Sequence, residues 1–192
     1  MSEVGQRGVE PPRRPQRADA RRNYDSLLTA AHDAFADVGA SATLEDIARR
    51  AGVGIGTLYR HFPTRQALFE TVYVHEVEAL CRSAADVADL APWDALVAWL
   101  HRFAAYMATK RAVVEELARD SELLISCRTA IQAAGAPLLD RAQASGEARP
   151  DLEFDDVLRL VMGITLIQPS DPAQVERLLG LAIDGMRPRA AG

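Results

Sequence analysis

The sequence predicts an all-α protein, and three observations support that prediction. Alanine and leucine are abundant and aromatic residues make up only 6% of the 192 residues, a composition that favours helix over strand. Apolar residues recur at steps of three and four through most of the chain. No stretch alternates in the way that marks a half-buried strand, and even residues 160–167 are better explained as part of a helix.

Length and composition indicate a globular protein of one domain or two small ones. Hydrophobic residues make up 48% and charged residues 26% of the chain, both ordinary values. No apolar run approaches the roughly 18 residues that span a bilayer, and no charged-then-apolar leader opens the chain. Cys81 and Cys127 form neither a disulfide framework nor a zinc-ligand spacing. We therefore expect a cytoplasmic protein without a membrane partner.

Charge is distributed unevenly along the chain, whose net charge is −5. Residues 1–65 carry ten arginines and eight acidic residues, whereas residues 66–192 carry twelve basic and nineteen acidic ones. Only the first, net positive part suits contact with a polyanion. Because residues 1–18 hold three prolines and four arginines with few apolar groups, we expect a disordered basic arm there. A solvated tail and an arm that reaches nucleic acid are both consistent with this composition.

The first helix is expected from Asp19, with one apolar stripe and a glycine stop at Gly39. A second helix begins near Thr43, whose hydroxyl caps its first turn, and ends at Gly52. The third helix is short and covers residues 55–61.

A fourth helix is expected from Arg65 to about Arg82, because Pro63 breaks the chain and Thr64 supplies a cap. Further helices are expected at about 93–109, 112–119, 122–145, 153–168 and 172–186. The main interruptions are expected at Gly135, Pro137, Gly146, Pro150 and Pro169.

Residues 43–62, with the sequence TLEDIARRAGVGIGTLYRHF, predict a helix-turn-helix. Gly52 in the turn can adopt a positive φ, which lets the second helix leave at a steep angle. Ala48 and Ala51 are small enough for the two helices to approach closely. The residues expected to fill the core between them are Ile47, Val53, Leu58 and Phe62.

The exposed face of the third helix carries the candidate nucleic-acid contacts. A rotation of 100° per residue places Thr57, Arg60 and His61 opposite the apolar side, with Tyr59 on the flank. Hydroxyl, guanidinium, imidazole and phenol groups are hydrogen-bond donors that suit a groove edged by phosphates. Helices of this type present their N-terminal residues to base edges, and here those residues are Ile55, Gly56, Thr57 and Tyr59.

Residues 27–72 also carry a combination that is specific as a set. Its members are Ala34-Phe35, Gly39, Thr43, Ile47-Ala48, Ala51-Gly52-Val53, Gly56-Thr57-Leu58-Tyr59, His61-Phe62, Arg65 and Leu68. In this combination the segment resembles the N-terminal domain of the TetR (tetracycline-repressor-like) family of transcriptional regulators. The resemblance implies a DNA-binding domain over residues 19–82, with its helix-turn-helix at 43–62, and a helical regulatory and dimerisation domain over residues 83–192.

The same resemblance implies two sets of DNA contacts. Thr43, Tyr59 and His61 would contact phosphates, whereas Ile55, Gly56 and Thr57 would lie nearest the bases. The candidate DNA-binding residues are, in full, Thr43, Gly54, Ile55, Gly56, Thr57, Tyr59, Arg60, His61 and Arg65.

Two positions depart from the family pattern. Gly54 stands where a serine or threonine cap is usual, and Arg65 stands where lysine is common, although either cation can hold a phosphate. Structural interpretations also stay open at several positions. Tyr59 can pack against the first helix, His61 can be a structural neighbour of the core, and the arginines at 49–50 can form a solvated face.

In the family, the C-terminal domain holds a ligand pocket and pairs two subunits through its last two long helices, which correspond here to about 154–167 and 173–186. The resemblance therefore implies a homodimer, although both apolar stripes can instead pack inside one subunit. Residues 151–188 also resemble the C-terminal end of an SbtR-like subgroup. The candidate dimerisation residues are Val157, Leu160, Val161, Ile164, Val175, Leu178, Leu179 and Ala182.

A ligand pocket would be built from the helices between about 66 and 168. Because few charged residues face inward there, we expect an apolar or aromatic effector. Packing of the core is the alternative role for each candidate lining residue. These candidates are Trp99, Phe103, Tyr106, Met107, Cys127 and Met162.

No catalytic site, metal site or cofactor is expected. The histidines are scattered, and the sequence contains no HExxH motif, no phosphate-binding glycine loop and no GxSxG turn. The expected function is a ligand-responsive repressor that binds double-stranded DNA as a homodimer. The alternative is an all-α adaptor or small-molecule-binding protein that does not bind DNA.

Overall fold

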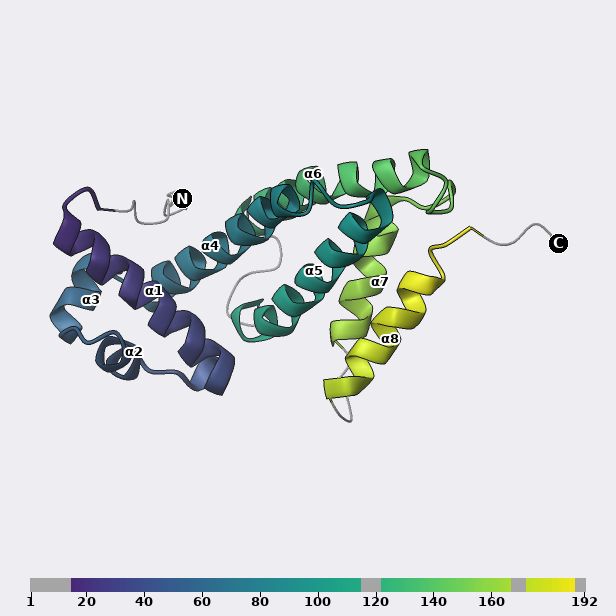
Figure 1. Ribbon diagram of the computed structural model, residues 1–192. Coiled ribbons are helices and arrows are strands. Elements are labelled where there is room, and N and C mark those ends of the chain that lie inside the picture. The colour runs from purple at the N-terminus through teal and green to yellow at the C-terminus, as the bar shows by residue number, and fades with distance from the viewer. Residues whose placement is uncertain (1–14, 115–121, 167–171, 189–192) are drawn as a thin grey trace, which may run out of the picture. The chain divides into compact units, whose positions relative to one another are not determined.

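The computed structural model describes residues 15–114, 122–166 and 172–188, which contain eight α-helices, one short 3-10 helix and no strand (Figure 1). The prediction of an all-α protein is therefore confirmed for these residues. Most of the expected basic arm lies outside them. The elements are α1 (Ala18–Val38), η1 (Gly39–Ser41), α2 (Leu44–Arg50), α3 (Ile55–His61), α4 (Arg65–Asp86), α5 (Pro92–Val114), α6 (Glu122–Ala144), α7 (Phe154–Leu166) and α8 (Pro172–Asp184).

The chain forms two compact units, one made mainly of residues up to Val74 and the other mainly of residues from His75 onward. The boundary falls inside α4, which is a single continuous helix of 22 residues. The N-terminal end of α4 therefore belongs to one unit and its C-terminal end to the other.

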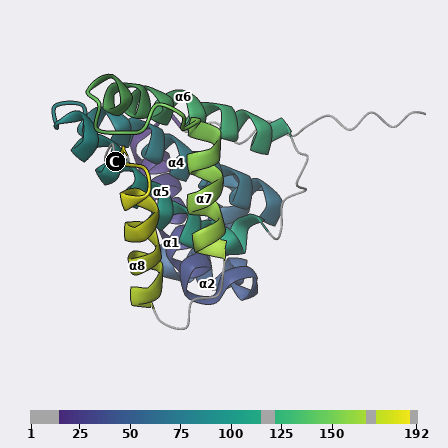
Figure 2. The same ribbon diagram turned by 90° about the vertical axis from the view of Figure 1, so that its right-hand side faces the viewer.

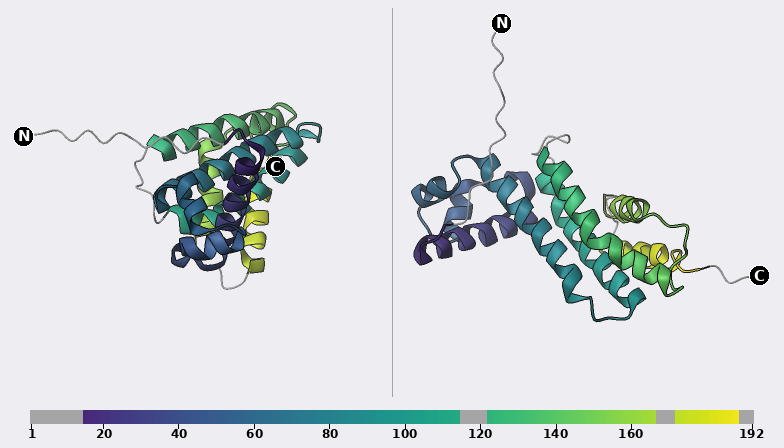
Figure 3. Two further views of the ribbon diagram at one scale, coloured as in Figure 1. Left: turned by 90° about the vertical axis from the view of Figure 1, so that its left-hand side faces the viewer. Right: turned by 90° about the horizontal axis from the view of Figure 1, so that it is seen from above.

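The first unit is built from α1, η1, α2, α3 and the start of α4, and α2 packs against both α1 and α3 (Figures 1 and 3). Its core includes the stacked rings of Phe35 on α1 and Phe69 on α4, whose centroids lie 4.0 Å apart. Leu27 and Leu68 are completely buried in the same core. Each such side chain contributes about 1.5–3 kcal/mol to folding, so this small unit depends on a few large residues.

The second unit contains α5 to α8, and α7 lies beside both α6 and α8 (Figures 1 and 2). Its aromatic cluster consists of Trp99, Phe103 and Phe154. The Trp99 ring stacks on Phe103 at 5.7 Å and lies 5.8 Å from Phe154. The Trp99 indole N–H is satisfied by the Leu80 carbonyl of α4 at 3.3 Å. The cluster therefore links α5 and α7 to the C-terminal part of α4.

The helix expected at about 122–145 is confirmed as α6, whereas two expected breaks are absent. Helix α5 runs without a break to Val114, through the gap expected after residue 109, because no glycine or proline ends it there. Helix α6 continues through Gly135 and Pro137. A proline inside a helix costs about 3 kcal/mol. Burial of Ile131, Leu138 and Leu139 on the inner face of α6 offsets that cost.

Candidate nucleic-acid interface

The helix-turn-helix at 43–62 begins with a side-chain cap. The Thr43 hydroxyl accepts a hydrogen bond from the Asp46 backbone N–H at 3.1 Å, as the sequence predicts for a helix start. After α2, the Val53 N–H donates to the Ala48 carbonyl at 3.0 Å and closes the turn. Gly52 adopts a φ of +69°, a conformation that side-chain-bearing residues rarely take. The cap and this glycine fix where α2 starts and how the chain leaves it.

The inner side of the motif is apolar. Ile47, Leu58 and Phe62 are completely buried, which confirms three of the four expected core residues. Val53 is only half-buried, so its assignment to the core was wrong, because it lies in the turn between the helices rather than on their shared face. Tyr24 of α1 covers Phe62, with their ring centroids 5.2 Å apart. Helix α1 thus packs against one side of the helix-turn-helix through Tyr24, and the opposite face of α3 stays exposed.

The open face of α3 presents the residues that the sequence nominates for base contact. The side chain of Ile55 is 37% exposed and that of Tyr59 is 47% exposed. Gly56 is exposed, Thr57 is half-buried and Arg60 is exposed. A Cβ atom added at Gly54 or Gly56 would meet no neighbour within 4 Å, so the backbone is open to an approaching partner at both positions. The structure therefore brings these residues together on one accessible surface.

Gly54 occupies the cap position of α3 and makes no side-chain capping bond. Its carbonyl accepts from the N–H of Thr57 at 2.8 Å, so the helix still starts at the expected place. The departure from the usual serine or threonine removes one side chain from the start of α3.

His61 lies between the exposed face and the core. Its ring lies 5.9 Å from the Tyr24 ring in an edge-on arrangement. Burial, followed by the positive charge of Arg60, lowers the pKa of the His61 imidazole from its ordinary value. The imidazole is therefore mainly neutral near pH 7 in the free protein.

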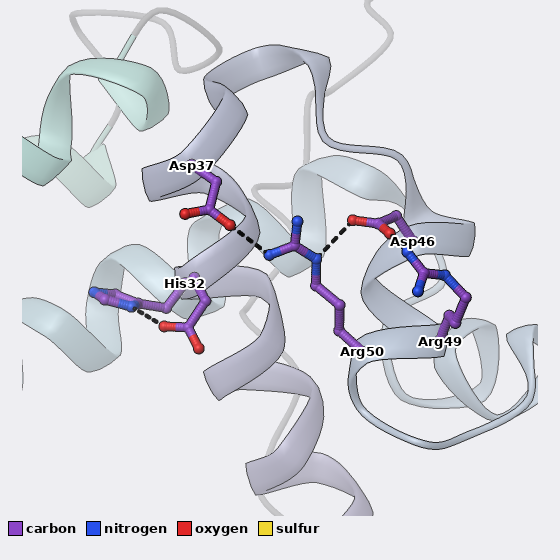
Figure 4. Close-up of polar contacts among 6 residues, drawn as sticks. His32, Asp37, Asp46, Arg49 and Arg50 are labelled. Carbon is purple, nitrogen blue, oxygen red and sulfur yellow. Dashed lines mark hydrogen bonds and ion pairs between the residues drawn. The ribbon is translucent and has the colours of Figure 1, made fainter.

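An arginine at the end of α2 fastens that helix to α1. The Arg50 guanidinium donates to Asp37 of α1 at 2.6 Å and to Asp46 of α2 at 2.7 Å (Figure 4). Hydrogen bonding from Arg50 is the main cause that holds the pKa of Asp46 below its ordinary value. The neighbouring Arg49 side chain also pairs with Asp46 but is 76% exposed, against 31% for Arg50. Arg49 and Arg50 were expected to form one solvated face. Instead, Arg49 faces solvent, whereas Arg50 is less exposed and bridges α2 to α1.

Arg65, the first residue of α4, is half-buried and faces the unit's interior. Its guanidinium donates a hydrogen bond to the Ala42 carbonyl, one residue before the α2 cap. The same group lies over the Phe69 ring, 4.8 Å from its centroid. The sequence places Arg65 among the DNA contacts, and the structure gives its side chain these protein partners.

The candidate ligand-lining residues lie in the interior of the second unit. Met162 is half-buried and the other five are buried. Trp99 and Phe103 fill the space between the helices with their own stacked rings. Two further residues, Phe154 and Gly135, belong to this cluster although the sequence does not nominate them as lining residues. Phe154 was expected only as a helix start, and Gly135 only as an interruption.

The candidate dimerisation residues divide between the interior and the surface. Val157, Val161 and Leu179 are buried within the unit, consistent with packing inside one subunit. Leu160 is 47% exposed on α7. Leu181 of α8, which is not among the candidates, is 68% exposed. The half-buried candidates are Ile164, Val175, Leu178 and Ala182.

Both exposed leucines line a surface groove of about 270 Å³. Apart from Arg149 and Asp156, its walls are apolar or glycine: Leu152, Val157, Leu160, Leu181, Ala182, Gly185 and Met186. The apolar residues at 157–164 predict one wall of this groove. No sequence pattern indicates that the loop at 149–152 forms another wall.

No helix among residues 15–114, 122–166 and 172–188 is long and apolar enough to cross a bilayer. Within the same ranges, no three histidine, cysteine or acidic side chains gather in a way that would hold a metal ion.

Comparison with known proteins gives matches over both units. Residues 27–72 match the family described as bacterial regulatory proteins, tetR family, and residues 91–188 match the C-terminal domain described as transcriptional regulator SbtR-like. The HTH-type transcriptional repressor KstR2 of Mycolicibacterium smegmatis is 30% identical over 184 residues, which cover 87% of this chain and 89% of that protein.

Solved structures agree with these matches. The TetR transcriptional regulator SCO0520 from Streptomyces coelicolor is 44% identical, with a TM-score of 0.74 over 86% of this chain and 99% of its own. A TetR transcription regulatory protein from Mycobacterium vanbaalenii is 32% identical, with a TM-score of 0.72 over 90% of this chain and 99% of its own.

Proposed function

Because this chain belongs to the TetR family of DNA-binding transcriptional regulators, we propose that it is a homodimeric repressor of a palindromic operator, released by a small apolar or aromatic effector. The observation that carries the proposal is the open face of α3, which presents hydrogen-bond donors on an exposed surface. The opposite side of α3 is anchored to α1 through the contact between the Phe62 and Tyr24 rings. The M. smegmatis relative is named a repressor, which supports repression as the outcome. Since bacterial chromosomes lie in the cytoplasm, we propose that the protein acts there.

We assign base reading to the N-terminal half of α3. Gly54 and Gly56 expose backbone, which allows the helix to lie deep in the major groove. The exposed Ile55 has no hydrogen bond to offer, so its fitting partner is the methyl group of a thymine. Thr57 supplies a hydroxyl that can donate to or accept from a base edge.

We assign phosphate contacts to the residues around this surface. The Thr43 hydroxyl already accepts a bond from the Asp46 N–H, so its own proton is available for a phosphate oxygen. The exposed Tyr59 phenol and the exposed Arg60 guanidinium are also donors. His61 donates through an imidazole N–H, and a nearby phosphate would favour its protonated form.

We place the dimer contact on α7 and α8. Leu160 and Leu181 are large apolar side chains left exposed beside an apolar groove, and a second copy of the same surface would bury them. Gly163 and Gly180 on these helices have open space at the Cβ position, which permits close approach of another helix. Two subunits paired in this way would present their α3 helices to successive major grooves about 34–36 Å apart, or a multiple of that distance.

We place the effector beside the aromatic cluster of the second unit. Because Trp99, Phe103 and Phe154 fill that interior themselves, an effector has to displace or stack upon their rings. Such a site selects an apolar or aromatic molecule. To release DNA, the effector must bind the non-binding conformation more tightly than the binding one.

The proposed operator binding is tested by selecting duplexes from a random pool with the purified full-length protein, followed by footprinting. We expect enrichment of an inverted repeat. The Tyr59→Ala variant should bind it less tightly, whereas Val38→Ala, a control at a similarly exposed site in the same unit, should bind as the wild type does. Failure to enrich any duplex would contradict the proposal.

The effector assignment has its own assay. Both tryptophans of the chain, Trp93 and Trp99, are buried in the second unit, so a compound that binds there should change their fluorescence. Aromatic compounds should also raise the unfolding temperature and release the selected duplex. If only charged metabolites stabilise the protein, the assignment is wrong.

A further inference from the structure

We propose that Arg65 is a positioning residue for DNA binding, which fastens the start of α4 to the segment leading into α2 and makes no phosphate contact of its own. The inference rests on the proposed operator binding and concerns a residue whose charge alone suggests a different role. Three observations of the first unit support it.

The first observation is the hydrogen bond from the Arg65 guanidinium to the Ala42 carbonyl. These residues lie 23 positions apart in the chain: Arg65 begins α4, whereas Ala42 lies between η1 and α2. Ala42 is 2% exposed and immediately precedes Thr43, the cap of α2 and a proposed phosphate contact. A charge-assisted bond at this point fixes the place where α2 begins.

The second observation is the aromatic surface beneath the guanidinium. Its central carbon lies 4.8 Å from the Phe69 ring centroid and 6.0 Å from that of Phe35. Both rings are buried and stacked on each other. A planar guanidinium can lie over such a ring while it donates at its edge, whereas a lysine ammonium cannot reproduce both contacts.

The third observation is the location of Arg65 in the first turn of α4. The Thr64 hydroxyl caps this helix by accepting from the Ala67 N–H at 3.0 Å. A cation in the first turn is disfavoured by the helix dipole. Local helix electrostatics therefore do not account for Arg65, whereas its contacts across the unit do.

These contacts define a joint between two parts of the DNA-binding unit. On one side are Ala42 and the start of α2, and on the other are Arg65 and the start of α4. If the joint is lost, the buried Ala42 carbonyl loses its partner and α2 is no longer held at one position. Only a fraction of molecules would then present α2 and α3 in the arrangement that binds DNA, which weakens the apparent affinity by that fraction.

The test compares Arg65→Lys, which keeps the charge, with Arg65→Met, which keeps the apolar stem. Both full-length variants are titrated with the duplex selected by the wild-type protein, at several salt concentrations, and both are unfolded thermally. We expect each to lose affinity by about tenfold and to unfold at a lower temperature, while the slope of log affinity against log salt stays at the wild-type value. Each lost phosphate contact would instead reduce that slope by about 0.9.

A matched control separates positioning from general loss of stability. Leu28→Val removes buried volume from α1 of the same unit without touching the contacts of Arg65 described above. This variant should unfold at a lower temperature yet keep the wild-type affinity at temperatures where it is folded. If Leu28→Val loses as much affinity as Arg65→Lys, the specific positioning role is wrong.

The remaining outcomes also decide the question. Wild-type affinity in Arg65→Lys together with a reduced salt slope in Arg65→Met would identify a phosphate contact and overturn the proposal. Wild-type unfolding temperature in both variants would overturn the joint itself, even if no duplex were ever selected. Absence of a selected duplex would instead count against the proposed function.

Discussion

Replacement of Gly135 by alanine should destabilise the second unit, although glycine is ordinarily the poorer helix former. Gly135 lies inside α6, where a Cβ atom would sit 2.3 Å from the Phe154 ring tip and 2.6 Å from the Trp99 indole. Ordinary contact begins at about 3.4 Å. Both rings are buried, and they lie on α7 and α5 respectively, so neither can turn away without disturbing another helix.

The magnitude follows from two opposing effects. Overpacking of a buried site costs about 1–3 kcal/mol and sometimes more. Gly→Ala in a helix interior recovers about 1 kcal/mol. Since the overlap with the Phe154 ring exceeds 1 Å and the Trp99 ring is also closer than ordinary contact, we expect a net loss of about 1–2 kcal/mol. For a chain of this size, that loss lowers the unfolding temperature by about 2–8 °C.

Thermal unfolding followed by tryptophan fluorescence measures this effect, because both tryptophans lie in the second unit. Ser126→Ala, on an exposed position of the same helix, controls for helix propensity and should leave the unfolding temperature unchanged or slightly raised. In a Phe154→Leu background, Gly135→Ala should cost less than in the wild type, because one of the two clashes is relieved. A Gly135→Ala variant that is as stable as the wild type would refute the reasoning.

Three further predictions concern function. Tyr59→Phe should weaken operator binding about tenfold without changing the unfolding temperature, because its ring is 47% exposed and only the hydroxyl is removed; equal affinity in a titration would argue against a phosphate contact. Leu181→Glu should convert a dimer to a monomer in sedimentation experiments, whereas Leu90→Glu, at another exposed leucine, should not; a dimeric Leu181→Glu would exclude this part of α8 from the interface. Burial and the Arg60 charge lower the pKa of His61, so the free protein should lose stability as the pH falls below about 6.5 through that lowered pKa. Operator affinity should rise over the same pH range, because a phosphate favours the imidazolium, and a His61→Gln variant should lack both components. A wild-type affinity that falls with pH no less than that of the variant would contradict the assignment.

Local signals in the sequence were sufficient to predict the helices and the turn of the DNA-binding unit. The Thr43 cap, the positive φ at Gly52 and the burial of Leu58 all follow from residue type and spacing, and the structure confirms each of them. The SbtR-like resemblance, noted only over residues 151–188, extends over 91–188. Helix α6 shows the limit of such signals, because glycine and proline at 135–137 suggest an interruption that long-range packing overrides.

Side-chain direction within the candidate site was harder to predict. The sequence predicts a solvated face for Arg49 and Arg50, and the family resemblance implies a DNA contact for Arg65. Their environments differ because Asp37 on α1 and Ala42 before α2 lie within reach of Arg50 and Arg65 only in the folded unit. The two partners of each pair are 13 and 23 residues apart in the chain, and no helix or turn pattern predicts contacts at those separations. Leu181 was missed because it lies outside the apolar stripe formed by Val175, Leu178, Leu179 and Ala182.

The two exposed glycines at the start of α3 have an evolutionary consequence. Gly54 and Gly56 take ordinary helix-start geometry rather than a strained one, and side chains at these sites would project into empty space. A duplicated gene could therefore acquire serine, asparagine or arginine at either site and retain its folding stability. New target sequences become reachable by single substitutions there, while the scaffold behind them stays under separate selection.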